Sequence, residues 1–482
     1  MTPIDEPLGR RAEGRCCAFA DDALGDHDAV GLVDALRTGK VSTAELVEAA
    51  IARTEAVNPS LNGLAYEAFD RARARGRAGA HGRHGGYFDG VPTFIKDNVA
   101  VRDMPTMQGT DAWDPKPMPA DGAFARVFLS TGLIPLGKTQ MSEFGFSASA
   151  EHPRIGPVRN PWNTDYTAGA SSSGAGAFVA AGVTPIAHAN DGAGSIRIPA
   201  AVNGLVGLKP TRGRLPLDEQ AAKMPLHLVA NGVLTRSVRD TAAFLREAER
   251  AYGNPKLPPI GDVVRAGKRR LHIAVCTESV VREASPEFRE LTLKAAALME
   301  ELGHRVTEIR NPVPAHLKDD FLIYWQFLSF AIVRGGRRMI GPSFDRTKLD
   351  NLTLGLDRAA ARNLYKVPRA IARLAASRRV TARLSHTYDA ILTPTLGDET
   401  PPIGYLDPTA PYEQIMDRLI NWVMFTPYSN ATGDPAISLP LAESATGMPV
   451  GMMLSAVRGQ EALLLELAFE LEEARPWPRI TV

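Results

Sequence analysis

Residues 165–200 read DYTAGASSSGAGAFVAAGVTPIAHANDGAGSIRIPA, with small residues clustered at 169–174 and again at 191–197. An apolar segment joins the two clusters. Glycine and serine at this density let the backbone turn tightly and point several N–H groups toward one place. Such a stretch suits a phosphate-binding loop, an oxyanion-binding turn or an ordinary tight turn, so residues elsewhere in the chain are needed to distinguish these.

The composition is that of an ordinary globular protein with almost no net charge. Among its 482 residues, Lys and Arg number 55 and Asp and Glu 54, which gives a formal charge of +1. A neutral chain has no long-range field that attracts nucleic acid or a membrane surface. Three cysteines are too few for a disulfide framework, and the first residues lack the apolar run of a signal peptide. We therefore predict a cytoplasmic protein with no nucleic-acid or membrane partner.

The order of the predicted elements indicates an α/β fold in which helices cover both faces of a sheet. Apolar runs at 271–276 and 305–309 predict strands, and amphipathic patterns at 287–302 and 461–473 predict helices. We expect residues 1–27 to be a leader. Because no internal repeat divides the remainder, residues 28–482 are predicted to form a single domain.

Residues 312–388 differ from the rest because their pattern is largely helical and basic. Between residues 334 and 383 there are 11 Arg and 2 Lys against 3 Asp. Such a segment could bind a polyanion, but its arginines do not alternate with a series of aromatic residues that could stack on bases. We therefore predict a solvated helical cap at about 312–388.

Residues 132–139, GLIPLGKT, match the pattern of a phosphate-binding loop, G-x-x-x-x-G-K-[ST]. A loop of this kind needs small residues whose amides surround the anion. Here the interior is Leu-Ile-Pro-Leu, and Pro135 has no N–H to donate. The run is more typical of a strand, so a nucleotide-binding protein is only a remote alternative.

Val91, Phe94 and Ile95 predict a short buried strand. Lys96 follows it and precedes Asp97, and two interpretations of this lysine are open. It can form a salt bridge with Asp97, which the local sequence by itself favours, or it can lie buried with a lowered pKa. His81 and His84 lie in a glycine-rich tract without a neighbouring carboxylate or cysteine. We predict a solvated loop at these histidines and no metal site in the protein.

Hydrolysis of an acyl compound by a serine needs a nucleophile, a route for its proton, and N–H donors for the oxyanion. Ser195 ends the run GAGS at 192–195, in which several N–H groups can point to one place. No histidine forms a recognisable pair with it, so the base would be a lysine whose pKa burial has lowered. Lys96 is the candidate, and Ser171 and Ser172 can carry the proton, since a hydroxyl both donates and accepts.

These residues and the motifs around them resemble the amidase signature family of serine hydrolases over nearly the full length of the chain. The resemblance implies that family's fold, a large mixed β-sheet flanked by helices on both faces. It also accounts for the false phosphate-loop pattern, because GKT at 137–139 belongs to a family motif. The motifs are GVPTFIKD at 90–97, GKTQMSEFG at 137–145, the signature from NPW at 160–162 to GLKPT at 207–211, YDAILTPT at 388–395, TGDPA at 432–436 and GMPVG at 447–451.

The resemblance assigns the base to Lys96, a bridging serine with a cis peptide bond to Ser171, and the acylated nucleophile to Ser195. The implied oxyanion amides are those of Gly192, Ala193, Gly194 and Ser195, and the implied supporting residues are Ser172, Asp191 and Arg197. Two departures stand out: the family's Gly-Gly-Ser-Ser-Gly-Gly is GASSSG at 169–174, and Ala193 replaces a glycine. Because alanine keeps its N–H, we expect the oxyanion site to survive the replacement.

The activity that the resemblance implies is hydrolysis of the C–N bond of non-peptide amides, without a cofactor. The residues of these motifs are similar to those of nylon-oligomer hydrolases and urethane-cleaving members of the family. Carbamates and esters are therefore further candidate substrates. We expect a small-molecule substrate and a monomer or homodimer. The substrate pocket would be built by residues after Met141, the 312–388 region with its aromatic residues, and 422–430. An alternative is the amidase subunit of a tRNA-dependent glutamine amidotransferase, which would need a partner chain.

Overall fold

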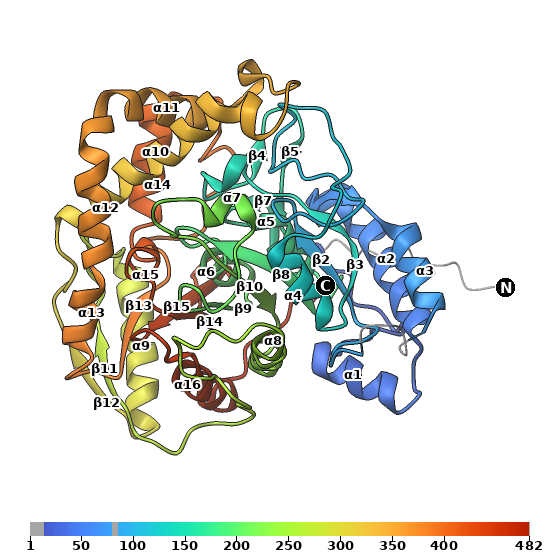
Figure 1. The fold of residues 1–482 in the computed structure, drawn as a ribbon. Helices are drawn as coiled ribbons and strands as arrows, with labels where there is room; N and C mark the ends of the chain where they lie inside the picture. Colours follow the sequence, from blue (N-terminus) through green and yellow to red (C-terminus); the bar gives the residue numbers. More distant parts are fainter. Residues whose placement is uncertain (1–13, 80–84, 482) are drawn as a thin grey trace.

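An eight-stranded mixed sheet forms the centre of the molecule in a computed structural model, which describes residues 14–79 and 85–481 (Figure 1). The strand order is β12-β11-β13-β15-β14-β9-β10-β8. Strand β11 runs parallel to β12 and β13, and the other neighbours are antiparallel, so the sheet is mixed as predicted. The strands are β8 (Ile186–Asp191), β9 (Val206–Lys209), β10 (Ala230–Thr235), β11 (His272–Val275), β12 (Arg305–Glu308), β13 (Ala390–Pro394), β14 (Ala436–Glu443) and β15 (Pro449–Ser455).

Helices cover both faces of this sheet. Two successive residues of β15 contact helices on opposite faces. Gly451 approaches Ala201 in α6, whereas the sulfur of Met452 accepts a hydrogen bond from Thr292 in α9. Neighbouring residues of a strand point to opposite faces, so α6 and α9 lie on opposite sides. The helices outside the 312–388 region are α1 (Ala29–Arg37), α2 (Thr43–Leu61), α3 (Phe69–Arg77), α4 (Ala123–Ser130), α5 (Ser173–Ala180), α6 (Arg197–Asn203), α7 (Glu219–Ala222), α8 (Val238–Ala251), α9 (Pro286–Glu301), α14 (Tyr412–Trp422), α15 (Pro427–Thr432) and α16 (Glu461–Ala474).

A second, three-stranded sheet carries Lys96 toward the centre of the molecule. It contains β1 (Leu64–Glu67), β3 (Ile134–Thr139) and β2 (Pro92–Lys96), in that order. Strand β2 is tied to β8, because Thr93 Oγ1 donates to the carbonyl of Ile186 and the N–H of Lys96 donates to His188. Two short pairs complete the strands: β4 (Glu151–His152) with β5 (Gly156–Pro157), and β6 (Arg159–Asn160) with β7 (Asn163–Thr167).

The stretch that matches a phosphate-binding loop is part of β3 and not a loop. Lys138 is fully buried, and its Nζ donates to the carbonyl of Val99 and to Thr106 Oγ1. The nucleotide-binding alternative is therefore wrong, because the apolar interior of the pattern forms a strand instead of an anion-binding turn. His81 and His84 lie outside the described residues. Among the described residues there is no group of His, Cys, Asp and Glu that could hold a metal ion.

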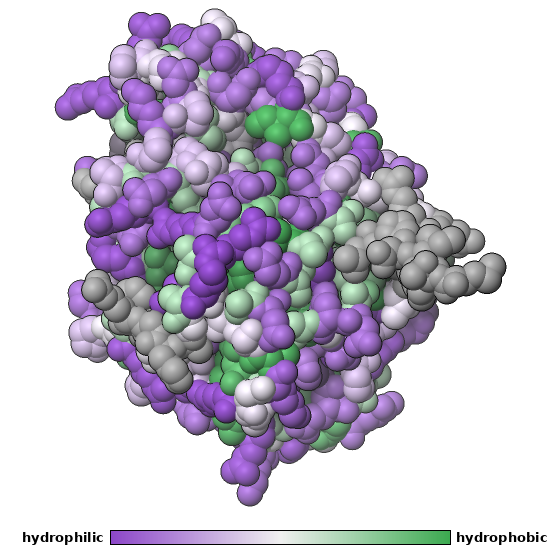
Figure 2. Space-filling model, turned by 90° about the vertical axis from the view of Figure 1, so that its right-hand side faces the viewer, coloured by the Kyte–Doolittle hydropathy of each residue, from purple (hydrophilic) through white to green (hydrophobic). Residues whose placement is uncertain are grey.

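The 312–388 region contains α10 (His316–Met339), α11 (Asn351–Asn363), α12 (Val367–Ala376) and α13 (Arg378–Leu384), which lie along one side of the molecule (Figure 1). The described part of the predicted leader runs along the body, where Cys16 and Ala18 donate backbone hydrogen bonds to Pro161 and Ala181. The face seen in Figure 2 is mostly hydrophilic, with small groups of hydrophobic side chains between the polar ones. None of the helices in the described part of the chain is long and apolar enough to cross a membrane.

Candidate active site

Four segments of the chain bring the predicted site residues together. Lys96 ends β2, Ser171 and Ser172 precede α5, and Asp191 ends β8. The turn at 192–195 then leads into α6, which begins at Arg197. Because β2 lies beside β8, a lysine 75 residues before Ser171 in the sequence reaches that serine directly.

Lys96 is completely buried and faces two polar side chains. Its Nζ lies 2.6 Å from Ser171 Oγ and 2.7 Å from Asn190 Oδ1. Burial lowers the pKa of Lys96 to about 7, against the opposing effect of the Asp191 carboxylate. A lysine with this pKa is partly neutral near pH 7 and can accept a proton.

The local sequence favoured a salt bridge between Lys96 and Asp97, and this prediction is wrong. Asp97 faces Lys138 instead, with Oδ1 3.7 Å from Nζ, and its carboxylate also accepts the N–H of Met107. The two side chains diverge because successive residues of an extended chain point in opposite directions. No carboxylate of the described residues is in direct contact with Lys96, and burial therefore dominates its pKa.

Ser195 lies next to Ser171 but contacts it differently from the expected relay. The backbone N–H of Ser171 donates to Ser195 Oγ at 3.1 Å. All peptide bonds of the described residues are trans, so the cis bond expected at Ser171 is not found. Trans is the ordinary state of a bond that does not precede proline. Ser172 Oγ donates to the carbonyl of Asn190, which ties the serine cluster to the end of β8.

The turn at 192–195 offers fewer free amides than expected. The N–H of Gly194 donates to Asp191 Oδ1 at 2.7 Å, so it is not available to a substrate oxygen. The N–H groups of Gly192, Ala193 and Ser195 have no acceptor among the residues that the structure describes. Ala193 does not have a positive φ, whereas Gly194 has a φ of 140°, so the alanine stands where the backbone tolerates a side chain.

Behind the turn, Arg197 and Asp191 form a fully buried ion pair. Arg197 Nε donates to Asp191 Oδ2 and Nη2 to Oδ1, both at 2.9 Å. Burial acts to raise the pKa of Asp191, but the charge and hydrogen bonds of Arg197 outweigh it and lower that pKa to about 2. Asn430 completes the cluster by donating to Asp191 and accepting from Arg197. The carboxylate therefore stays ionised and fixes the turn through Gly194.

Replacing Arg197 by methionine is expected to destabilise the fold by about 3–5 kcal/mol, because the Asp191 carboxylate would remain buried without its partner. Thermal unfolding of the purified variant measures the effect. Arg289→Met is the matched control, since Arg289 forms ion pairs with Glu283 and Glu308 at the exposed surface. Exposed pairs contribute at most about 1 kcal/mol. Equal losses in the two variants would contradict the importance of the buried pair.

Three side chains that contact the site residues were not identified from the sequence. Asn190 binds Lys96. Its position directly before Asp191 was the feature of the sequence that could have indicated a place in the site. Thr426 Oγ1 donates to the carbonyl of Ala193 at 2.5 Å, and Asn430 joins the ion pair. Thr426 and Asn430 belong to the segment 422–430 that was expected to build the substrate pocket. They lie more than 200 residues beyond the turn, so local sequence gives no sign of their contact with it.

Aromatic residues form one wall beside the turn. A Cβ atom on Gly192 would lie 3.5 Å from the ring of Trp325, which α10 provides. Trp325 stacks on Phe321 and packs edge-on against Phe146, with ring centroids 5.7 and 5.4 Å apart. The helical region at 312–388 thus reaches the site through Trp325.

Comparison with known proteins gives matches along nearly the whole chain. The family model described as Amidase matches residues 45–465. A protein of Mycobacterium leprae (strain TN) that bears the name amidase AmiC is 66% identical over 470 residues, which cover 97% of this chain and 99% of that protein. The 6-aminohexanoate-cyclic-dimer hydrolase of Paenarthrobacter ureafaciens is 32% identical over 483 residues, with coverage of 94% and 95%.

A solved structure of 6-aminohexanoate cyclic dimer hydrolase has the same fold. It matches with a TM-score of 0.83 and 30% identity, and the match covers 95% of this chain and 98% of that one. The predicted mixed sheet with helices on both faces is therefore confirmed.

Proposed function

The chain belongs to the amidase signature family, whose hydrolases act on amides, and we propose that it cleaves the C–N bond of non-peptide amides through an acyl-Ser195 intermediate. The observation that carries the proposal is the contact of 2.6 Å between the buried Lys96 Nζ and Ser171 Oγ, beside the oxygen of Ser195. Residues 28–482 would act as one catalytic domain, in the cytoplasm, as a monomer or homodimer.

In the proposed first step, neutral Lys96 takes the proton of Ser171, Ser171 takes that of Ser195, and Ser195 Oγ attacks the carbonyl carbon. In the structure the two serine hydroxyls are not bonded to each other, so the step includes rotation of a serine side chain. The N–H groups of Gly192, Ala193 and Ser195 would bind the oxyanion. The proton then returns to the leaving amine, the C–N bond breaks, and water hydrolyses the acyl ester to release the acid.

Asn190 is well suited to support this base. Its amide oxygen accepts one N–H of Lys96 at 2.7 Å and carries no full negative charge. A carboxylate at the same place would stabilise the ammonium form and raise the pKa of Lys96. The amide therefore orients the amine toward Ser171 while leaving it able to lose its proton.

The range of substrates is tested with purified protein and a panel of aryl amides, carbamates and esters. We expect hydrolysis of the amides by the isolated chain, with carbamates and esters as slower or alternative substrates. An aryl sulfonyl fluoride is expected to inactivate the protein and to be found on Ser195 by mass spectrometry. Release of ammonia from glutamine that requires a second chain, without hydrolysis of aryl amides, would instead support the amidotransferase subunit.

A further inference from the structure

Two acidic side chains join the helical region at 312–388 to the segment beside Ser171. Glu143 is buried, and its Oε1 accepts the backbone N–H of Asp350 at 3.0 Å. Asp350 is the N-cap residue of α11, and its Oδ1 accepts the N–H of Thr353 at 2.7 Å. The two carboxyl groups also lie within hydrogen-bonding range of each other. Glu143 and Asp350 thus form a carboxyl pair.

The geometry of the carboxyl pair favours one shared proton. With both groups ionised, Glu143 Oε2 is buried and has no hydrogen-bond partner among the described residues. A protonated carboxyl can donate a hydrogen bond, so a proton between the two groups removes the mutual repulsion of two carboxylates. Burial raises the pKa of Glu143, and the charge of Asp350 raises it further. The pair therefore keeps a proton at a pH at which an exposed glutamate is ionised.

The charged groups around the carboxyl pair are engaged elsewhere. Arg154 lies in the field of both carboxyl groups, but its Nε donates to the two oxygens of Asp111 at 2.9 and 2.8 Å. His152 lies 3.7 Å from Asp111, and burial lowers its pKa to about 4, so it is neutral near pH 7. Lys348 donates to the backbone carbonyl of Asp111. Within the described part of the chain, none of these cationic side chains donates to the carboxyl pair, so a proton is what neutralises it.

Glu143 begins a short segment that lies against the proposed relay serine. A Cβ atom on Gly145 would lie 3.4 Å from Ser171 Oγ. Between Glu143 and Gly145, Phe144 has a φ of 50°, a backbone conformation that residues other than glycine rarely adopt. Such a conformation persists only where the surroundings hold it. The position of residues 143–146 therefore depends on their anchors, of which Glu143 is one.

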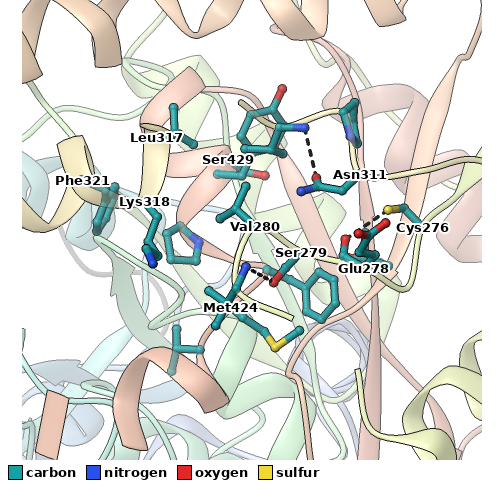
Figure 3. Close-up of a pocket in the computed structure, with 18 of the residues that line it drawn as sticks. Cys276, Glu278, Ser279, Val280, Asn311, Leu317, Lys318, Phe321, Met424 and Ser429 are labelled. Atoms are coloured by element: carbon teal, nitrogen blue, oxygen red, sulfur yellow. Dashed lines mark hydrogen bonds between the residues drawn. The ribbon is translucent and has the colours of Figure 1, made fainter. Parts of the chain in front are cut away.

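The helical region does not pack closely on the central sheet along its whole length. Helix α10 borders the apolar cavity shown in Figure 3, which Leu317 and Phe321 line. Ile391 of β13 and Met453 of β15 line the same cavity. Because space separates part of α10 from the sheet, fewer contacts fix the helical region there. Contacts elsewhere, such as that of Glu143 with the start of α11, are correspondingly more important.

We propose that Glu143 is a positioning residue for the proposed hydrolysis, because the carboxyl pair holds residues 143–146 beside Ser171 only while its two groups share a proton. As far as activity is concerned, this inference rests on the proposed function. When the proton is lost, two negative charges face each other at a buried site, and their repulsion weakens the contact between Glu143 and α11. Gly145 then loses its fixed place against Ser171, whose hydroxyl has to stay aligned with Lys96.

The first measurement is the Tm of thermal unfolding between pH 5 and 9 for the parent and for Glu143→Gln. The glutamine amide can accept the N–H of Asp350 and donate to its carboxylate, but it does not titrate. A group whose pKa is raised in the folded protein stabilises it fully below its ordinary pKa, and this stabilisation is lost as the pH rises through the raised pKa. Over this range, the Tm of the parent is therefore expected to fall by at least about 2 °C more than that of Glu143→Gln.

The second measurement is kcat/KM for an anilide above pH 8, where Lys96 is mostly neutral. From pH 8 to 9.5, kcat/KM of the parent is expected to fall at least about threefold, whereas that of Glu143→Gln should stay within about twofold. A merely structural role of Glu143 would lower kcat/KM of the variant equally at every pH. The pH profile therefore separates the two roles.

Glu290→Gln is the matched control, because Glu290 is exposed on α9 and pairs with Lys294. It should follow the parent in both measurements. Asp350→Asn, which also removes one titrating group of the pair, replaces Glu143→Gln if that variant does not fold.

The proposal is overturned if the Tm curves of the parent and Glu143→Gln run parallel from pH 5 to 9, or if kcat/KM falls equally in both above pH 8. Either result with continued hydrolysis of the anilide would leave the proposed function intact. A difference between the Tm curves in a parent that is inactive on all anilides would instead remove the proposed function and support the shared proton.

Discussion

Replacing Ser195 by alanine is expected to lower kcat on an aryl amide by about three to six orders of magnitude. The variant keeps the amides of the turn but loses the oxygen that attacks the carbonyl carbon. Ser195 is buried and accepts a hydrogen bond from Ser171, so its loss removes no charge and should leave the fold intact. Steady-state hydrolysis of an anilide, followed by the release of the aniline, measures the effect.

Ser329→Ala is the control for this variant. Ser329 is also fully buried, but its Oγ donates to the carbonyl of Thr353 in the helical region, away from Lys96. Its replacement should change kcat by less than a few fold. Ser195→Ala protein that is folded and hydrolyses the anilide at the parental rate would refute the assignment of the nucleophile.

The second large effect is expected at Lys96, whose replacement by alanine should remove activity while the protein remains folded. In the parent, activity should rise with pH through about 7, because Lys96 accepts a proton only in its neutral form and burial lowers its pKa to about 7. Activity is lost below this pH because the lysine is then protonated and cannot accept the proton of Ser171. The dependence of kcat/KM on pH between 5 and 9 measures it.

Two further variants separate Lys96 from other groups. Asn190→Asp places a carboxylate beside Lys96 and should move the rise to higher pH by at least about one unit. Lys209 also has a pKa that burial lowers to about 7, but its Nζ donates to the carbonyls of Pro210 and Asp434. Lys209→Met should therefore leave unchanged the pH at which kcat/KM reaches half of its maximum. A shift of this pH in Lys209→Met, with no shift in Asn190→Asp, would refute Lys96 as the base.

The predicted elements agree well with the observed ones where the chain has a regular pattern. The helix expected at 287–302 is α9 (Pro286–Glu301), and the one expected at 461–473 is α16 (Glu461–Ala474). The strand expected at 271–276 is β11, which is one residue shorter at each end, and the one expected at 305–309 is β12, which ends one residue earlier. The periodicity of apolar residues indicates which side of a helix or strand is buried, and it can be recognised within a short stretch of sequence.

The candidate site was only partly predictable because its contacts are not local. Lys96 on its own favoured the wrong partner, Asp97. The need for a proton route pointed to Ser171 and Ser172 together, and the resemblance to a family singled out Ser171. The structure then removed Gly194 from the expected oxyanion amides, because its N–H is taken by Asp191. A hydrogen bond across a turn depends on the path of the backbone, which residue identity does not specify.

The sequence by itself determined the mixed α/β class, the glycine- and serine-rich turn at 192–195, and the positions of Lys96, Ser171 and Ser195 in the family motifs. The tertiary structure decided the rest: that Lys96 is buried with no carboxylate of residues 14–79 or 85–481 in contact, that its amine contacts both Asn190 and Ser171, and that Thr426 and Asn430 hold the turn. The physical reason is that a pKa depends on desolvation and on partners brought from distant segments. Those partners meet only when β2, β8 and α15 pack together.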